Sequence, residues 1–153
     1  MKIYVASSWR NALQPTIVRA LRQCGHEVYD FRHPKPGDDG FTWKQVGAGT
    51  AFVNKVEPAT WRKMLEHPRA AEAYEADISH VRWCEAVVYV LPCGRSASFE
   101  FGYAMGQGKR GGSVSAWVVR RWIGQHSIRR KTRPCRVLVN RPRGTQNCAN
   151  DAA

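Results

Sequence analysis

The stretch that decides the fold is EAVVYVL, residues 85–91, which is a continuous apolar run after its first residue. Such a run is typical of a strand in the middle of a parallel sheet, buried on both faces. It ends at the turn-forming residues 92–94, and residues 96–107 then have the composition of a helix. The order of strand, glycine-containing loop and helix indicates an α/β protein.

The N-terminal part of the chain predicts a second unit of this kind. Residues 2–6 (KIYVA) and 26–31 (HEVYDF) have the composition of strands, and apolar residues at helical spacing over 11–24 indicate a helix between them. Gly25 suits the position that closes such a helix. A strand, a helix and a strand within about 30 residues form a βαβ unit, so we expect a mainly parallel sheet.

The segment between the second and third predicted strands has two parts. Residues 32–58 are rich in proline and glycine but also hold aromatic side chains, which favours a packed lid over a loose linker. Residues 59–83 have helical composition, with a break expected at Pro68. After the helix of residues 96–107, the run VSAWVV at 114–119 predicts one more strand.

The net charge of +12 is distributed unevenly along the 153 residues. Residues 1–107 hold 13 Lys and Arg against 11 Asp and Glu, whereas residues 108–153 hold 11 Lys and Arg against a single acid, Asp151. A nearly neutral body is therefore followed by a very basic end, and the two parts are interpreted separately.

Several classes of protein are disfavoured by composition. No apolar run approaches the ~20 residues that cross a bilayer, so we expect no membrane partner. The five cysteines form no C-x-x-C pair, which argues against a disulfide framework or a zinc site and favours a cytoplasmic protein. No His, Asp and Glu spacing is typical of a metal site, so we expect neither metal nor cofactor.

Ligands of an open parallel sheet bind beyond the carboxyl ends of its strands, where three predicted loops lie. The loop after residue 91 is the most informative, because Gly94, Arg95, Ser96 and Ser98 stand between a buried strand and a helix start. Free backbone amides and the helix dipole make such a loop an anion site, and an arginine there can hold a phosphate with two hydrogen bonds.

Two carboxylates near this loop are candidates for acid and nucleophile. Glu100 is expected in about the first turn of the helix, and Asp77 precedes the third strand. Carboxylates in different environments can divide the roles of nucleophile and proton donor at a sugar carbon. The structural alternative for Glu100 is that a glutamate in a first helical turn simply complements the helix dipole.

Three segments resemble the nucleoside 2-deoxyribosyltransferase family, whose wider superfamily includes nucleotide N-glycoside hydrolases. They are KIYVASSW at 2–9, YEADI at 74–78 and, most specifically, SFEFGYAMGQGK at 98–109. The resemblance covers about residues 1–110 and implies a flavodoxin-like or Rossmann-like three-layer α/β fold. It also implies cleavage of the N-glycosidic bond of a nucleoside or nucleotide.

The resemblance implies a role for each matching residue. Glu100 matches the family's nucleophile, which attacks the anomeric carbon, and Asp77 matches the residue that contacts the base and helps it to leave. Ser7, Ser8 and Trp9 match the loop that lines the pocket. Tyr4, before that loop, is expected to be structural. His33 follows the second strand at the edge expected for substrate contact.

The chain departs from the transferase pattern at Gly94, where the family commonly has a second aspartate. Relatives that bind phosphate use small polar residues in this loop, so Arg95, Ser96 and Ser98 make a 5′-phosphate plausible. The alternative to a transferase is therefore a nucleotide N-glycoside hydrolase acting on a 5′-monophosphate.

The second departure is the basic end of the chain, which does not match the family. We divide the chain into an enzyme-like domain, 1–119, and a basic tail, 120–153. The tail is interpreted in three ways: an arm that binds nucleic acid, a poorly ordered appendix, or the product of a change of reading frame. The family also implies a homo-oligomer.

Overall fold

The computed structural model describes residues 1–47 and 56–115. The helices and strands in chain order are β1 (Lys2–Ala6), α1 (Gln14–Gln23), β2 (Glu27–Tyr29), the short 3₁₀ helix η1 (Trp43–Val46), α2 (Pro58–Leu65), α3 (Pro68–Trp83), β3 (Ala86–Val90), α4 (Arg95–Gly106) and β4 (Arg110–Val114).

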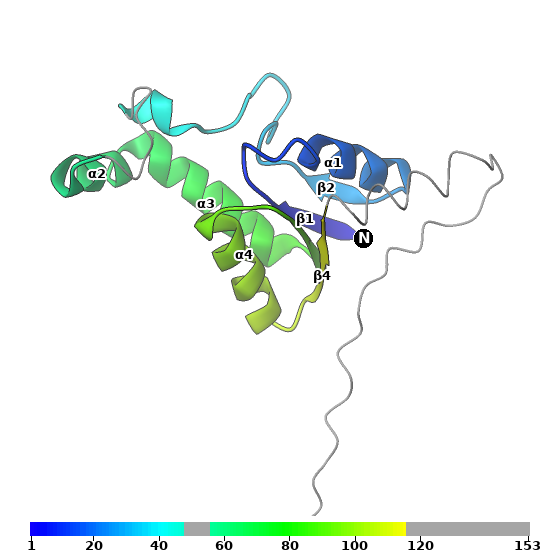
Figure 1. The fold of residues 1–153 in the computed structure, drawn as a ribbon. Coiled ribbons are helices and arrows are strands. Elements are labelled where there is room, and N and C mark those ends of the chain that lie inside the picture. The colour runs from blue at the N-terminus through cyan, green and yellow to red at the C-terminus, as the bar shows by residue number, and fades with distance from the viewer. Residues whose placement is uncertain (48–55, 116–153) are drawn as a thin grey trace, which may run out of the picture.

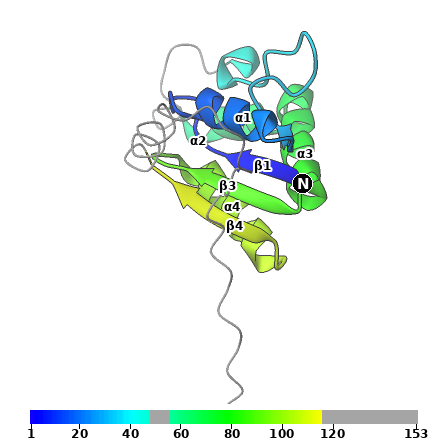
Figure 2. The same cartoon turned by 90° about the vertical axis from the view of Figure 1, so that its right-hand side faces the viewer.

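The strands form one parallel sheet in the order β2-β1-β3-β4. β1 pairs with β2, with Tyr4 opposite Tyr29, and with β3, with Val5 opposite Val88. Helix α1 lies on one face of this sheet, and α3 and α4 lie on the other (Figures 1 and 2). The predictions of an α/β fold, a parallel sheet and an internal position for β3 are confirmed.

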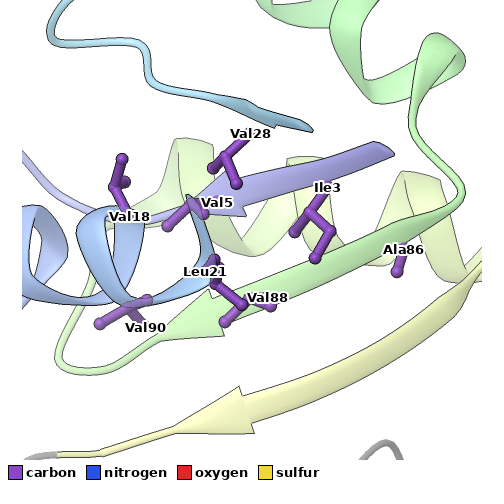
Figure 3. Packing of buried hydrophobic residues seen from close by; sticks show 8 residues of the cluster. All are labelled: Ile3, Val5, Val18, Leu21, Val28, Ala86, Val88 and Val90. Carbon is purple, nitrogen blue, oxygen red and sulfur yellow. The ribbon is translucent and has the colours of Figure 1, made fainter. Parts of the chain in front are cut away.

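The alternation of side chains along β1 divides the hydrophobic core into two clusters. Ile3 and Val5 belong to the cluster that packs against α1, which Figure 3 shows from close by. Tyr4 and Ala6 belong to the cluster that packs against α3 and α4. Because β1 is buried on both faces, a hydroxyl on it, such as that of Tyr4, is held inside the protein.

β4 lies earlier in the chain than the sequence predicted. The strand expected at 114–119 runs from Arg110 to Val114, and 116–119 are outside the described residues. Its Gly-Gly-Ser composition is typical of a turn, but a Cβ at Gly111 would overlap Sδ of Met105 and lie 3.1 Å from the Phe101 ring. A side chain at this position would therefore require Met105 of α4 to shift.

The break predicted at Pro68 is confirmed, since α2 ends at Leu65 and α3 begins at Pro68. His67 caps α3 by accepting a hydrogen bond from the Arg69 amide at 3.1 Å. None of the helices in the described ranges is long and apolar enough to cross a membrane. The predicted tail, 120–153, lies outside the described residues, so its boundary stays a prediction.

Candidate active site

The order of the strands defines where a ligand is expected. From β1 the chain crosses to β2 on one side, and β3 and β4 then follow on the other side, so the direction of winding changes between β1 and β3. In open α/β sheets, ligands bind outside the carboxyl ends of the strands at this point. The loops that begin at Ser7 and Leu91 meet there.

Asn11 ties these two loops together. Its side-chain amide donates to the carbonyls of Val90, at 3.0 Å, and Pro92, at 2.9 Å. The Ser7 hydroxyl also donates to the Val90 carbonyl, at 3.3 Å. These hydrogen bonds hold the loop after β1 against the end of β3 and the loop that follows it.

Arg32 fixes the β1 loop from the β2 side. One terminal nitrogen of its guanidinium donates to three backbone carbonyls, those of Ser8 at 3.0 Å, Trp9 at 2.8 Å and Asn11 at 2.9 Å. The same guanidinium lies 5.5 Å from the centroid of the Trp9 ring. The predicted pocket residues Ser7, Ser8 and Trp9 therefore stand on a loop whose backbone is well held.

The two predicted carboxylates lie close enough to interact, on the sheet face covered by α3 and α4. Asp77 comes from α3 and Glu100 from α4, both are half-buried, and the charge of Asp77 acts on Glu100. The Tyr29 hydroxyl donates to Oδ1 of Asp77 at 3.1 Å. The Tyr4 hydroxyl lies beside Glu100, buried and without a hydrogen bond of ordinary geometry to any described residue.

Burial dominates the electrostatics of this cluster. It raises the pKa of Asp77 to about 6, against a smaller lowering by the Tyr29 hydrogen bond. Burial, with the charge of Asp77, raises the pKa of Glu100 to about 7, against a smaller lowering by Tyr4. Burial also raises the pKa of Tyr4 and Tyr29, so both tyrosines stay protonated donors. At a pH between these two pKa values, the two carboxyl groups together hold one proton.

Glu100 lies deeper in its helix than the sequence suggested. α4 begins at Arg95, so Glu100 falls in the second turn rather than the first. There it is half-buried and beyond the free amides of the first turn, which weakens the interpretation that it only complements the dipole.

The predicted anion loop begins α4. Gly94 is the N-cap residue, and Arg95 and Ser96 are exposed and make no hydrogen bond or ion pair with the described residues. Ser98 is committed elsewhere, because its hydroxyl lies 2.7 Å from that of Tyr89 and 3.2 Å from the Gly94 carbonyl. Arg95 and Ser96 are thus the members of this loop whose side chains are available to an anion.

The remaining predicted residues have contacts of their own, none of them with Asp77 or Glu100. Trp9 is 42% exposed and packs edge-on against Phe31. The Ser8 hydroxyl accepts from the Arg10 amide at 3.2 Å. His33 is exposed and lies 3.4 Å from Asp30, so its one close partner among the described residues is a carboxylate outside the cluster.

Sequence reasoning missed the two tyrosines of the cluster. Tyr4 was expected to be structural, and Tyr29 was one residue of a predicted strand. Their common role follows from the pairing of β1 with β2, which sets Tyr4 opposite Tyr29 with the rings stacked at 5.5 Å. The alternation within each strand was the available signal, but the register between the strands is needed to bring the hydroxyls to one place.

No group of three His, Cys, Asp or Glu side chains within 1–47 and 56–115 is arranged to hold a metal ion. An apolar hollow lined by Ile3, Val88 and Val114, among others, includes neither carboxylate. Comparison of the chain with protein-family models, with curated proteins and with solved structures found no match. Interpretation of the site therefore depends on its own chemistry and on the sequence motifs.

Proposed function

We propose that this protein cleaves the N-glycosidic bond of a nucleoside, deoxynucleoside or nucleotide, with Glu100 as nucleophile and Asp77 assisting the departing base. The observation that carries the proposal is the half-buried pair of interacting carboxylates, one on α3 and one on α4, each with a raised pKa and a tyrosine hydroxyl beside it. The motifs at 74–78 and 98–109, which resemble the nucleoside 2-deoxyribosyltransferases, support the same assignment.

The fold is compatible with this proposal. The strand order 2-1-3-4 is the beginning of the flavodoxin-like order, and the loops after β1 and β3 lie where ligands of such sheets bind. We therefore propose a flavodoxin-like fold for residues 1–119, with Ser7, Ser8 and Trp9 at the mouth of the pocket.

The chemistry would run in two steps. An oxygen of the Glu100 carboxylate attacks the anomeric carbon while the bond to the base nitrogen breaks, its electron pair leaves with the base, and Asp77 gives the base a proton. The sugar is then held as an ester of Glu100. Water or a second base attacks the same carbon, passes its proton to Asp77, and releases the Glu100 carboxylate.

The protonation states needed are an ionised Glu100 and a protonated Asp77. Between about pH 6 and 7 the pair holds one proton, which rests mainly on Glu100 because the pKa of Glu100, about 7, lies above that of Asp77, about 6. The reactive form, with the proton on Asp77, is therefore the less populated one, and the Tyr4 hydroxyl favours it by stabilising the ionised form of Glu100. A cationic, oxocarbenium-like sugar would be stabilised by the negative charge of the pair. The rate is therefore expected to be greatest near the interval in which the pair holds a single proton.

The available side chains of Arg95 and Ser96 favour a 5′-phosphate as a further substrate group, because they stand where the amides at the start of α4 are free. This supports the alternative of a nucleotide N-glycoside hydrolase. Binding of nucleic acid by 120–153, assembly as a homo-oligomer and a cytoplasmic location stay predictions.

The test is incubation of the full chain with a panel of nucleosides, deoxynucleosides and their 5′-monophosphates, with chromatography of the released base. Transfer to an added second base indicates a transferase, and release to water alone indicates a hydrolase. Glu100→Gln should reduce the rate at least about 1,000-fold, since it removes the nucleophile. The matched control is Glu72→Gln, an exposed carboxylate of α3 with a surface ion pair to Arg69 at 3.6 Å. Equal rates for the two variants would overturn the assignment.

A further inference from the structure

Tyr29 is the residue of the carboxylate cluster that neither the sequence motifs nor the resemblance singled out. It ends β2 and is buried, and its hydroxyl donates to Oδ1 of Asp77 at 3.1 Å. Asp77 is on α3, so this hydrogen bond joins an outer strand of the sheet to a helix packed on it. Oδ2 of Asp77 has no hydrogen-bond partner among the described residues.

The ring of Tyr29 is held from both sides. The Tyr4 ring stacks on it with the centroids 5.5 Å apart, and the His80 ring stacks on it at 3.7 Å with an angle of 14° between the planes. His80 is itself fixed, because its Nδ1 donates to the Ala76 carbonyl at 2.6 Å. A tyrosine clamped in this way has little freedom to turn its hydroxyl away from Asp77.

We propose that Tyr29 is a positioning residue for Asp77: clamped between Tyr4 and His80, it fixes Oδ1 and leaves Oδ2 as the oxygen that carries the transferred proton. This inference rests on the proposed function, since a proton transferred by Asp77 is part of that chemistry. When the proton leaves Oδ2 for the base, Asp77 becomes a carboxylate and the hydrogen bond from Tyr29 becomes charge-assisted and stronger. The interaction therefore stabilises the transition state more than the bound substrate.

Among the charged and polar groups around Asp77, the Tyr29 hydroxyl is the one that stabilises its ionised form. Glu100 on α4 repels its charge, Tyr4 on β1 lies beside Glu100, and the Asp38 carboxylate lies near Tyr29. His80 on α3 contacts the ring of Tyr29 rather than the carboxylate. No ion pair joins Asp77 to a Lys, Arg or His of the described residues. Tyr29 is thus the one hydrogen-bond donor found on Asp77 in those residues.

The first experiment follows the ionisation of Asp77 itself. The full chain, labelled with ¹³C at the aspartate carboxyls, contains five aspartates, and Asp77→Asn identifies the signal of Asp77. In Tyr29→Phe the pKa of Asp77 should rise above its value of about 6, because the stabilising donor is lost. Tyr103→Phe, which removes an exposed hydroxyl that accepts from Arg82 at 3.1 Å, should leave it unchanged. His80→Phe keeps a ring against Tyr29 and should also preserve the wild-type titration.

The second experiment measures kcat and KM for released base. Tyr29→Phe should lower kcat about 10- to 100-fold with little change in KM, and Tyr103→Phe should alter neither. An Asp77 titration in Tyr29→Phe that matches the wild type, in a variant that unfolds at the wild-type temperature, would overturn the inference. So would a kcat no lower than that of Tyr103→Phe. If the wild type releases no base at all, the proposed function fails, whereas the titration still decides whether Tyr29 controls Asp77.

Discussion

Replacing Glu100 by glutamine is expected to stabilise the fold above pH 7 while changing its stability little near pH 4.5. The ordinary pKa of this side chain is 4.5, and burial together with Asp77 raises it to about 7 in the fold. Between these values the native state binds more protons than the unfolded chain, so the free energy of unfolding falls as the pH rises. Glutamine resembles the protonated form and has no proton to lose.

The expected magnitude follows from the two values. A rise from 4.5 to about 7 corresponds to about 3 kcal/mol of cost once the side chain is ionised, at about 1.4 kcal/mol per pH unit. Because Glu100 is half-buried, water screens part of this cost, and about 3 kcal/mol is an upper limit. Glu100→Gln should therefore gain up to about 3 kcal/mol over the wild type at about pH 8.

The assay is urea unfolding of the full chain at about pH 4.5 and about pH 8, with the free energy of unfolding compared between wild type and variant. Glu72→Gln serves as the control, because Glu72 is exposed and its ion pair with Arg69 is on the surface. Its effect should stay within about 0.5 kcal/mol at both pH values. If the Glu100→Gln variant is equally or less stable than the wild type at about pH 8, the inference that an unpaired carboxylate at this position destabilises the fold is wrong.

Two further predictions concern the frame around the site. Asn11→Ala removes two hydrogen bonds to the end of β3 and the loop after it, and one that the Asn11 side chain accepts from the Leu13 amide, and should lower the free energy of unfolding by about 2 kcal/mol. Ser79→Ala, which removes one exposed hydroxyl bond, is the control in the same urea assay, and an equal loss would contradict the bridging role of Asn11. Gly111→Val places a side chain against Met105 and should lower the thermal midpoint, with a cost of about 1–3 kcal/mol. Met105→Ala in the same chain should recover part of that loss, and no loss at all would show that α4 does not cover β4 so closely.

The main strands were predictable because burial on both faces leaves an apolar run that composition reveals. β3, residues 86–90, lies between β1 and β4 in the sheet, and the continuous apolar run from Ala86 to Val90 predicted this internal position. β4 was misplaced because Gly111 and Gly112 fall within it, where Met105 and Phe101 of α4 pack against Gly111, and glycine in a sequence indicates a turn far more often than a strand. A local pattern cannot report which helix will cover a strand.

The carboxylates of the site were predictable and their partners were not. Glu100 and Asp77 stand in motifs whose spacing can be read along the chain, whereas Tyr4 and Tyr29 come together only through the register of β1 on β2. Asn11 and Arg32 were missed for the same reason, since the carbonyls that they bind belong to other loops. A sequence pattern identifies candidate side chains, but the groups that position them are set by tertiary pairing.

The electrostatics of the cluster explain why a cationic transition state would suit it. Two half-buried carboxylates and two tyrosine hydroxyls gather there, and no Lys, Arg or His of the described residues forms an ion pair with Asp77 or Glu100. Each hydroxyl can stabilise a carboxylate by hydrogen bonding, yet neither supplies positive charge. A sugar that develops positive charge beside Glu100 would provide the missing counter-charge during the reaction alone. The same unpaired charge that lowers the stability of the fold above pH 7 would in this way favour the transition state over the bound substrate.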